Sequence, residues 1–94
     1  MRTIKYTARF KKDFKREKKA SKNREFFEKE LLSFVKQLAE DKKLPKKYYD
    51  HALNGEWADH RDCHFKPDLV LIYQKPSQGS LILVRLGSHS ELGL

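Results

Sequence analysis

The side chains that could carry chemistry near neutral pH gather in the C-terminal half of this 94-residue chain. They include all four histidines, which are His51, His60, His64 and His89. Imidazole titrates near physiological pH, so it can both accept and donate a proton. Asp68 follows His64 after a turn at Pro67, and its carboxylate could hold an imidazole in one tautomer. Together these types predict acid–base chemistry, although each histidine taken alone fits an ordinary surface residue.

A zinc site is a poor explanation for these histidines. The spacing His60-x-x-Cys63-His64 supplies possible ligands. In a strand over residues 57–65, however, alternate side chains point to opposite faces, so Cys63 points away from His64. His60 is expected to share the face of His64. The pattern therefore predicts no metal site and favours Cys63 as a small buried hydrophobic residue.

The C-terminal half contains two arginines, Arg61 and Arg85. Arg85 lies inside an apolar segment, where an unpaired charge is costly. It should therefore pair with an acidic residue or face an anion-binding surface. A planar guanidinium that binds phosphate would explain its position.

Positive charge is concentrated at the other end of the chain. The formal net charge is +8, and residues 1–47 hold 17 Lys and Arg against 7 Asp and Glu. This asymmetry favours a polyanionic partner such as nucleic acid, although a merely solvated helix face is the alternative. The basic residues expected to bind RNA are Lys11, Lys12, Lys15, Arg16, Lys18 and Lys19.

Hydrophobic periodicity predicts one α+β domain over residues 1–94. A strand over 3–7 is followed by a helix over 8–20, with Thr7 as its N-cap, and by a second helix over 24–41. Strands are expected over 57–65, 68–74 and 81–86, with a hairpin loop at 75–80. The order β-α-α-β-β-β predicts a small, mainly antiparallel sheet. Both helices pack on one face and leave the other face open.

The single cysteine excludes a disulfide within the chain and favours a reducing compartment. No apolar segment resembles a signal peptide or a membrane span. We therefore expect a cytoplasmic protein that does not bind a membrane.

Three motifs resemble those of the YafQ branch of the RelE/ParE toxin superfamily. The resemblance implies a RelE-like fold. The resemblance covers the whole chain. In the N-terminal part it is limited to the type of element, a strand followed by basic helices. The motifs are Asp50-His51-Ala52-Leu53-Asn54-Gly55-x-Trp57, then Arg61-Asp62-Cys63-His64-x-x-Pro67-Asp68-Leu69-x-Leu71-Ile72-Tyr73, then Arg85-Leu86-Gly87-Ser88-His89-Ser90-Glu91-Leu92.

This resemblance implies an mRNA interferase, the toxin of a type II toxin–antitoxin pair, which cuts mRNA in the ribosomal A site. Its partners would be mRNA, rRNA and a cognate antitoxin, and it would use no metal or other cofactor. The positions that match the family's active residues are His51, His64, Asp68 and His89. Arg61 and Arg85 match arginines near the same surface, and His60 has no counterpart.

On this basis we expect His64 and His89 to be the acid/base pair, with Asp68 orienting one of them. His51 would transfer a further proton or position the substrate, and Arg85, with Arg61, would stabilise the charge on phosphorus. The family usually has a phenylalanine where this chain has Gly93, and that aromatic would contact the base or ribose of the substrate.

Two other functions stay open. The non-nuclease branch of the same superfamily binds DNA gyrase and does not need His51, His64 and His89 together. A basic RNA-binding or ribosome-associated protein without catalysis would also fit the charge. The histidine set favours the nuclease.

Overall fold

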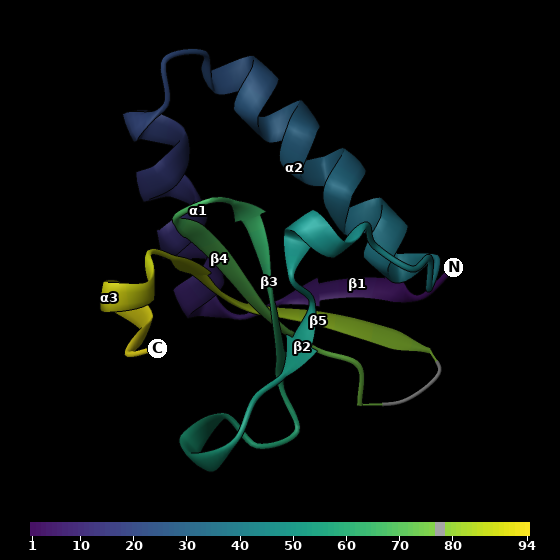
Figure 1. The fold of residues 1–94 in the computed structure, drawn as a ribbon. Coiled ribbons are helices and arrows are strands. Elements are labelled where there is room, and N and C mark those ends of the chain that lie inside the picture. The colour runs from purple at the N-terminus through teal and green to yellow at the C-terminus, as the bar shows by residue number, and fades with distance from the viewer. Residues whose placement is uncertain (77–78) are drawn as a thin grey trace.

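A computed structural model describes residues 1–76 and 79–94 as a sheet and two long helices (Figure 1). Residues 77 and 78, inside the predicted loop 75–80, lie outside the described residues. The elements are β1 (Thr3–Tyr6), α1 (Ala8–Ala20), α2 (Arg24–Ala39), η1 (Lys46–Tyr48), β2 (His51–Ala52), η2 (Gly55–Trp57), β3 (Arg61–Lys66), β4 (Leu69–Gln74), β5 (Ser80–Gly87) and α3 (His89–Leu92).

The strand order across the sheet is β1-β5-β4-β3-β2. β1 runs parallel to β5, and the other neighbours are antiparallel. α1 and α2 pack against one face of this sheet (Figure 1). The predicted α+β class and the mainly antiparallel sheet are therefore confirmed.

The segment before β3 differs from the prediction. A single strand was expected over 57–65, but Gly55–Trp57 is a 3-10 turn and the strand begins at Arg61. The backbone is left-handed at Gly55 (φ +65°) and Asp59 (φ +68°), and a strand cannot accommodate this conformation. His51 lies in the two-residue β2, which is too short to show a periodic signal.

The ends of the helices also refine the prediction. The Thr7 side chain caps α1 by accepting from the Phe10 N–H, as predicted. α2 ends at Ala39, two residues before the predicted end, where Asp41 takes a left-handed backbone (φ 58°). After Gly87, beyond the last predicted strand, the chain forms the short helix α3.

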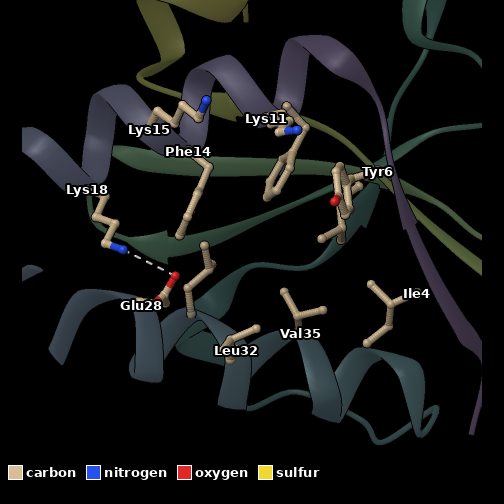
Figure 2. A pocket seen from close by; sticks show the side chains of 12 residues that line it. Ile4, Tyr6, Lys11, Phe14, Lys15, Lys18, Glu28, Leu32 and Val35 are labelled. Carbon is tan, nitrogen blue, oxygen red and sulfur yellow. Dashed lines mark hydrogen bonds and ion pairs between the residues drawn. The ribbon is translucent and has the colours of Figure 1, made fainter. Parts of the chain in front are cut away.

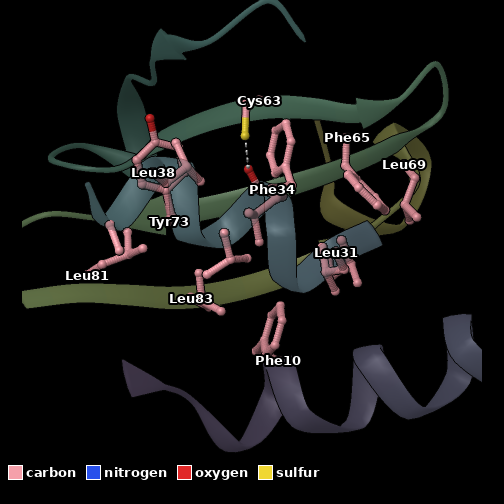
Figure 3. Packing of buried hydrophobic residues seen from close by; sticks show 14 of the residues in the cluster. Phe10, Leu31, Phe34, Leu38, Cys63, Phe65, Leu69, Tyr73, Leu81 and Leu83 are labelled. Carbon is pink, nitrogen blue, oxygen red and sulfur yellow. Dashed lines mark hydrogen bonds between the residues drawn. The ribbon is translucent and has the colours of Figure 1, made fainter. Parts of the chain in front are cut away.

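The core lies between the helices and the sheet (Figure 3). The predicted stripe of α2 is buried, and the side chains that form it are Phe27, Leu31, Phe34, Val35 and Leu38. Cys63 lies in the same cluster with no exposed surface, and burial raises the pKa of its thiol. Cys63 is therefore an inert core residue, as predicted.

A shallow apolar groove opens between α1, α2 and β1 (Figure 2). Its volume is about 420 Å³, and Tyr6, Phe14 and Leu32 are among the residues that line it. Lys11 and Lys15 of α1 stand at its margin. The groove is on the helical side of the sheet, opposite to the face that carries His64.

Where β1 ends, Thr7 and α1 cover the edge of β5 instead. Beyond Tyr6 no strand among the described residues pairs with this side of β5, so the backbone of β5 needs other partners. Thr7 Oγ1 donates to the Val84 carbonyl at 2.7 Å. The Leu86 N–H donates to Asp13 Oδ2 at 3.0 Å, and Arg16 donates to the Leu86 carbonyl at 3.0 Å.

Asp13 is the centre of this connection, because it is only 3% exposed. Arg85 Nε lies 2.7 Å from Asp13 Oδ2, and Arg16 Nη1 lies 3.0 Å from Oδ1. Burial opposes ionisation of this carboxyl, but the hydrogen bonds from Arg85, the Leu86 N–H and Arg16 outweigh it and lower its pKa. The ionised side chain is therefore built into the fold.

Replacing Asp13 should destabilise the protein strongly. D13A leaves the Arg85 guanidinium and the Leu86 N–H without their acceptor, and we expect it to lower the free energy of unfolding by about 3 kcal/mol at pH 7. The lowered pKa means that this contribution is complete above the ordinary carboxyl range and disappears as pH falls through the folded pKa. Urea unfolding at several pH values measures both effects.

The matched control is E30A, which removes a surface ion pair with Lys66. Its cost should be below about 1 kcal/mol. Equal costs for D13A and E30A would contradict the central role of Asp13.

Candidate active site

Three of the four histidines meet on the face of the sheet that α1 and α2 leave uncovered. His51 comes from β2, His64 from β3 and His89 from the first position of α3. The register pairs His51 with Asp62, two residues before His64. The His64 and His89 rings pack edge to face with centroids 4.8 Å apart. The structure therefore brings together the histidines that the motifs indicated.

Asp68 orients His89. Its Oδ1 accepts from His89 Nδ1 at 3.1 Å and from the His89 backbone N–H at 3.5 Å. These bonds lower the pKa of the Asp68 carboxyl. Ser88 and Glu91 form a capping box that fixes the start of α3 and hence the place of His89. The imidazole that the Asp68 carboxylate binds is thus that of His89 and not that of its sequence neighbour His64.

His51 is held by backbone and carboxylate together. Its Nδ1 lies 2.8 Å from the Tyr49 carbonyl and 3.0 Å from Asp62 Oδ1. The hydrogen-bond geometry is satisfied for the carbonyl, so Nδ1 carries the proton and Nε2 keeps its lone pair in the neutral ring. His89 donates from Nδ1 in the same way. Both rings therefore present Nε2 as the nitrogen free to exchange a proton.

Asp62 was not among the predicted site residues. Its side chain lies under the histidines and is only 3% exposed. No hydrogen-bond donor in the described part of the chain reaches its Oδ1. Burial raises the pKa of this carboxyl, and the charges of His51, His64 and His89 act in the opposite direction. The signal in the sequence was an acid on the His64 face of a strand.

Tyr49 is a second residue that the sequence analysis missed. Its ring lies 4.6 Å from the ring of His51 and 5.4 Å from that of His64, measured between centroids. It is 62% exposed, and its backbone is left-handed at φ 47°. Such a conformation is uncommon for a bulky residue and is often found at functional sites. Nothing in the sequence marked this loop residue.

His60 does not share the face of His64, contrary to the prediction. It precedes β3, its Nδ1 bonds the Ala58 carbonyl at 3.0 Å, and its ring packs against Trp57. The expected alternation failed because residues 55–60 form turns rather than a strand. His60 therefore lies outside the histidine cluster.

Three predicted phosphate-binding arginines are engaged elsewhere. Arg61 lies on the Cys63 face of β3 and bonds Asp50 at 3.2 Å. Arg85 pairs with Asp13, which is one of the two possibilities that the sequence left open. Arg16 contacts acceptors that include Asp13 and the Leu86 carbonyl. Their guanidinium groups thus support the fold, and phosphate binding by them stays a prediction.

The lysines of α1 fit the predicted basic surface better. Lys11, Lys12, Lys15 and Lys19 are exposed, and no ion-pair partner is found for them in the described part of the chain. Lys18 differs, because its Nζ lies 3.3 Å from Glu28. The unpaired charge on α1 therefore comes from these lysines and from Arg9, which is also exposed and has no ion-pair partner among the described residues.

Comparison with known proteins agrees with this geometry. The family model described as "Bacterial toxin of type II toxin-antitoxin system, YafQ" matches residues 2–93. The chain belongs to the YafQ toxin family. The mRNA interferase toxin YafQ of Escherichia coli K12 is 35% identical over 91 residues, which cover 97% of this chain and 95% of that protein.

Solved structures of YafQ and related toxins share the fold. A metal-bound toxin from Helicobacter pylori superposes with a TM-score of 0.85 at 46% identity, covering 98% of this chain and 99% of that one. YafQ in the Escherichia coli DinJ-YafQ complex gives a TM-score of 0.79 at 32% identity, covering 98% of each chain. The whole chain therefore takes the architecture of YafQ toxins.

One of these relatives is metal-bound, and a metal site in this chain would need side-chain donors that converge on one point. Among residues 1–76 and 79–94, no three His, Cys, Asp or Glu side chains converge as the ligands of a metal ion would. His51 and His89 each commit Nδ1 to an oxygen atom.

No helix within residues 1–76 and 79–94 is long and apolar enough to cross a membrane.

The bond between Asp68 and His89 can be tested without an activity assay. Because His89 is the main cause of the lowered pKa of Asp68, we expect H89A to raise that pKa towards the ordinary aspartate value. Carboxyl ¹³C shifts recorded through a pH titration measure the change. H60A removes a histidine outside the cluster and should leave Asp68 unaffected. An unchanged titration of Asp68 in H89A would show that the pair is not formed in solution.

Proposed function

We propose that this chain is the toxin of a type II toxin–antitoxin pair and an endoribonuclease that cuts mRNA in the ribosomal A site. The observation that carries the proposal is the convergence of His51, His64 and His89 on an open sheet face, with Asp68 bonded to His89. Membership of the YafQ family and the name of the Escherichia coli relative, mRNA interferase toxin, support it.

The reaction uses the nucleophile that RNA itself carries. One imidazole takes the proton of the 2′-OH, and O2′ attacks the adjacent phosphorus. The P–O5′ bond breaks, and a second imidazole, already protonated, gives its proton to O5′. The products are a 2′,3′-cyclic phosphate and a free 5′-OH, and the enzyme needs no metal or other cofactor for this balance.

His64 and His89 are the acid/base pair in this scheme, because their rings are in contact and lie at the centre of the cluster. Asp68 holds His89 in the tautomer that exposes Nε2. His51 serves as an additional proton-transfer or positioning group. Since Arg85 is bound to Asp13, the positive charge that stabilises the phosphorane comes from protonated imidazole.

Tyr49 gives the site an aromatic surface for the substrate. Bases of single-stranded RNA bind by stacking on aromatic side chains. At Gly93, where the family usually has phenylalanine, the backbone is left-handed (φ +70°) and ends α3. A side chain there would be strained, so the exposed ring of Tyr49 takes over the contact with the base.

The lysines of α1 bind rRNA, and the cognate antitoxin binds and neutralises the toxin, as the Escherichia coli DinJ-YafQ complex indicates for that relative. The two alternatives, a gyrase-binding protein and a non-catalytic RNA-binding protein, give no reason for three histidines to converge. The geometry therefore favours the nuclease over both.

Removal of either histidine of the pair should abolish cleavage of ribosome-bound mRNA. We expect H64A and H89A each to reduce the rate by about 10²- to 10⁴-fold, the usual contribution of a general acid or base. Primer extension locates the cuts, and 3′-end analysis identifies the cyclic phosphate. H60A is the matched control and should cleave at the parent rate. Full activity in H64A and H89A would contradict the scheme.

The basic surface predicts binding that depends steeply on salt. Replacing Lys11, Lys12, Lys15 and Lys19 by glutamine should weaken ribosome binding and reduce the slope of log K against log salt by about 3. Sedimentation with ribosomes across a salt series measures the slope. H64A, which keeps the lysines, should bind like the parent. A parent affinity that does not change with salt would show that these lysines do not contact rRNA.

A further inference from the structure

Asp62 is the member of the histidine cluster that the proposed reaction leaves without a part. It lies on β3 opposite His51, and its side chain faces the cluster from inside the protein. His51 Nδ1 lies 3.0 Å from Asp62 Oδ1, but its proton is directed to the Tyr49 carbonyl. The carboxylate is thus in electrostatic contact with an imidazole to which it is not hydrogen-bonded.

A buried carboxylate without a donor is costly for the fold. Asp13 shows how this chain satisfies a carboxylate that serves stability, with two arginines and a backbone N–H as donors. For Asp62 Oδ1, no such donor is present in the described residues. What lies near it is the group of imidazoles that exchange protons in the proposed reaction. The cost is therefore explained by function rather than by stability.

We propose that Asp62 is a positioning residue for RNA cleavage, whose buried carboxylate supplies the negative charge opposite the protonated histidines. The inference rests on the nuclease function proposed above. Asp62 acts through the imidazoles, because its burial keeps it from touching the RNA.

The charges around Asp62 define its electrostatic effect on the histidines. His51 from β2, His64 from β3 and His89 from α3 attract its negative charge, while Asp50, which precedes β2, opposes it. Asp68 adds a second carboxylate, 3.1 Å from His89 Nδ1. When the base takes up the 2′-OH proton, Asp62 stabilises the new imidazolium in a site of low dielectric.

D62N tests the charge with little change in shape. We expect kcat for cleavage of ribosome-bound mRNA to fall 10- to 100-fold with KM changed less than twofold, and the acidic limb of the pH–rate profile to move to lower pH. D59N is the matched control, since Asp59 is an exposed acid and asparagine tolerates its left-handed backbone. It should keep both the rate and the profile of the parent.

Thermal unfolding separates this role from a structural one. Because burial of the charge opposes folding, D62N should melt at or above the temperature of the parent at pH 7 while it loses activity. A variant that lost activity only in proportion to its loss of folded protein would overturn the proposal, and so would a D62N with parent activity and an unshifted profile.

A second measurement does not depend on D62N. Coupling between two charged groups is reciprocal, so H51A should raise the pKa of Asp62 further above the ordinary aspartate range, as read from its carboxyl ¹³C shift. No change in Asp62 would overturn the proposal. The two failures are distinct, because a parent protein that does not cleave mRNA refutes the nuclease function, whereas normal cleavage by D62N refutes only the role of Asp62.

Discussion

One buried carboxylate, that of Asp13, connects the first helix to the last long strand. It accepts from the Leu86 N–H and from Arg85 and Arg16, and so completes an edge of β5 that β1 is too short to cover. The position of α3, and with it His89, depends on the end of β5 being fixed. Active-site geometry on one face of the sheet therefore rests on a polar contact with the helices.

Asp13 and Asp62 are the two acidic side chains found buried in the described residues, and they differ in how they are satisfied. Asp13 is surrounded by donors, which lower its pKa, whereas Asp62 has a raised pKa and an unbonded oxygen. The first arrangement is typical of a structural ion pair. The second stores unfavourable energy next to groups that transfer protons, as active sites often do.

Periodicity and motifs predicted the helices, the buried stripe of α2 and the three clustered histidines. They could not predict which side chains form hydrogen bonds and ion pairs with each other. Asp68 was expected beside one of the histidines, but only the fold of α3 shows that it is His89. Arg85 looked like a phosphate ligand because its acid, Asp13, lies 72 residues away. The turns around Asp59 depend on a left-handed backbone that no periodic pattern reveals.

The arrangement of β1 has a consequence for synthesis on the ribosome. β1 pairs only with residues 80–83 of β5 among the described strands, and α1 is fastened to Leu86. The N-terminal part of the chain must therefore wait for its partner strand until β5 has left the exit tunnel, and such long-range pairing slows folding. His89, which follows β5, joins His51 and His64 last for the same reason. A growing chain thus has no complete histidine cluster until its synthesis has passed His89.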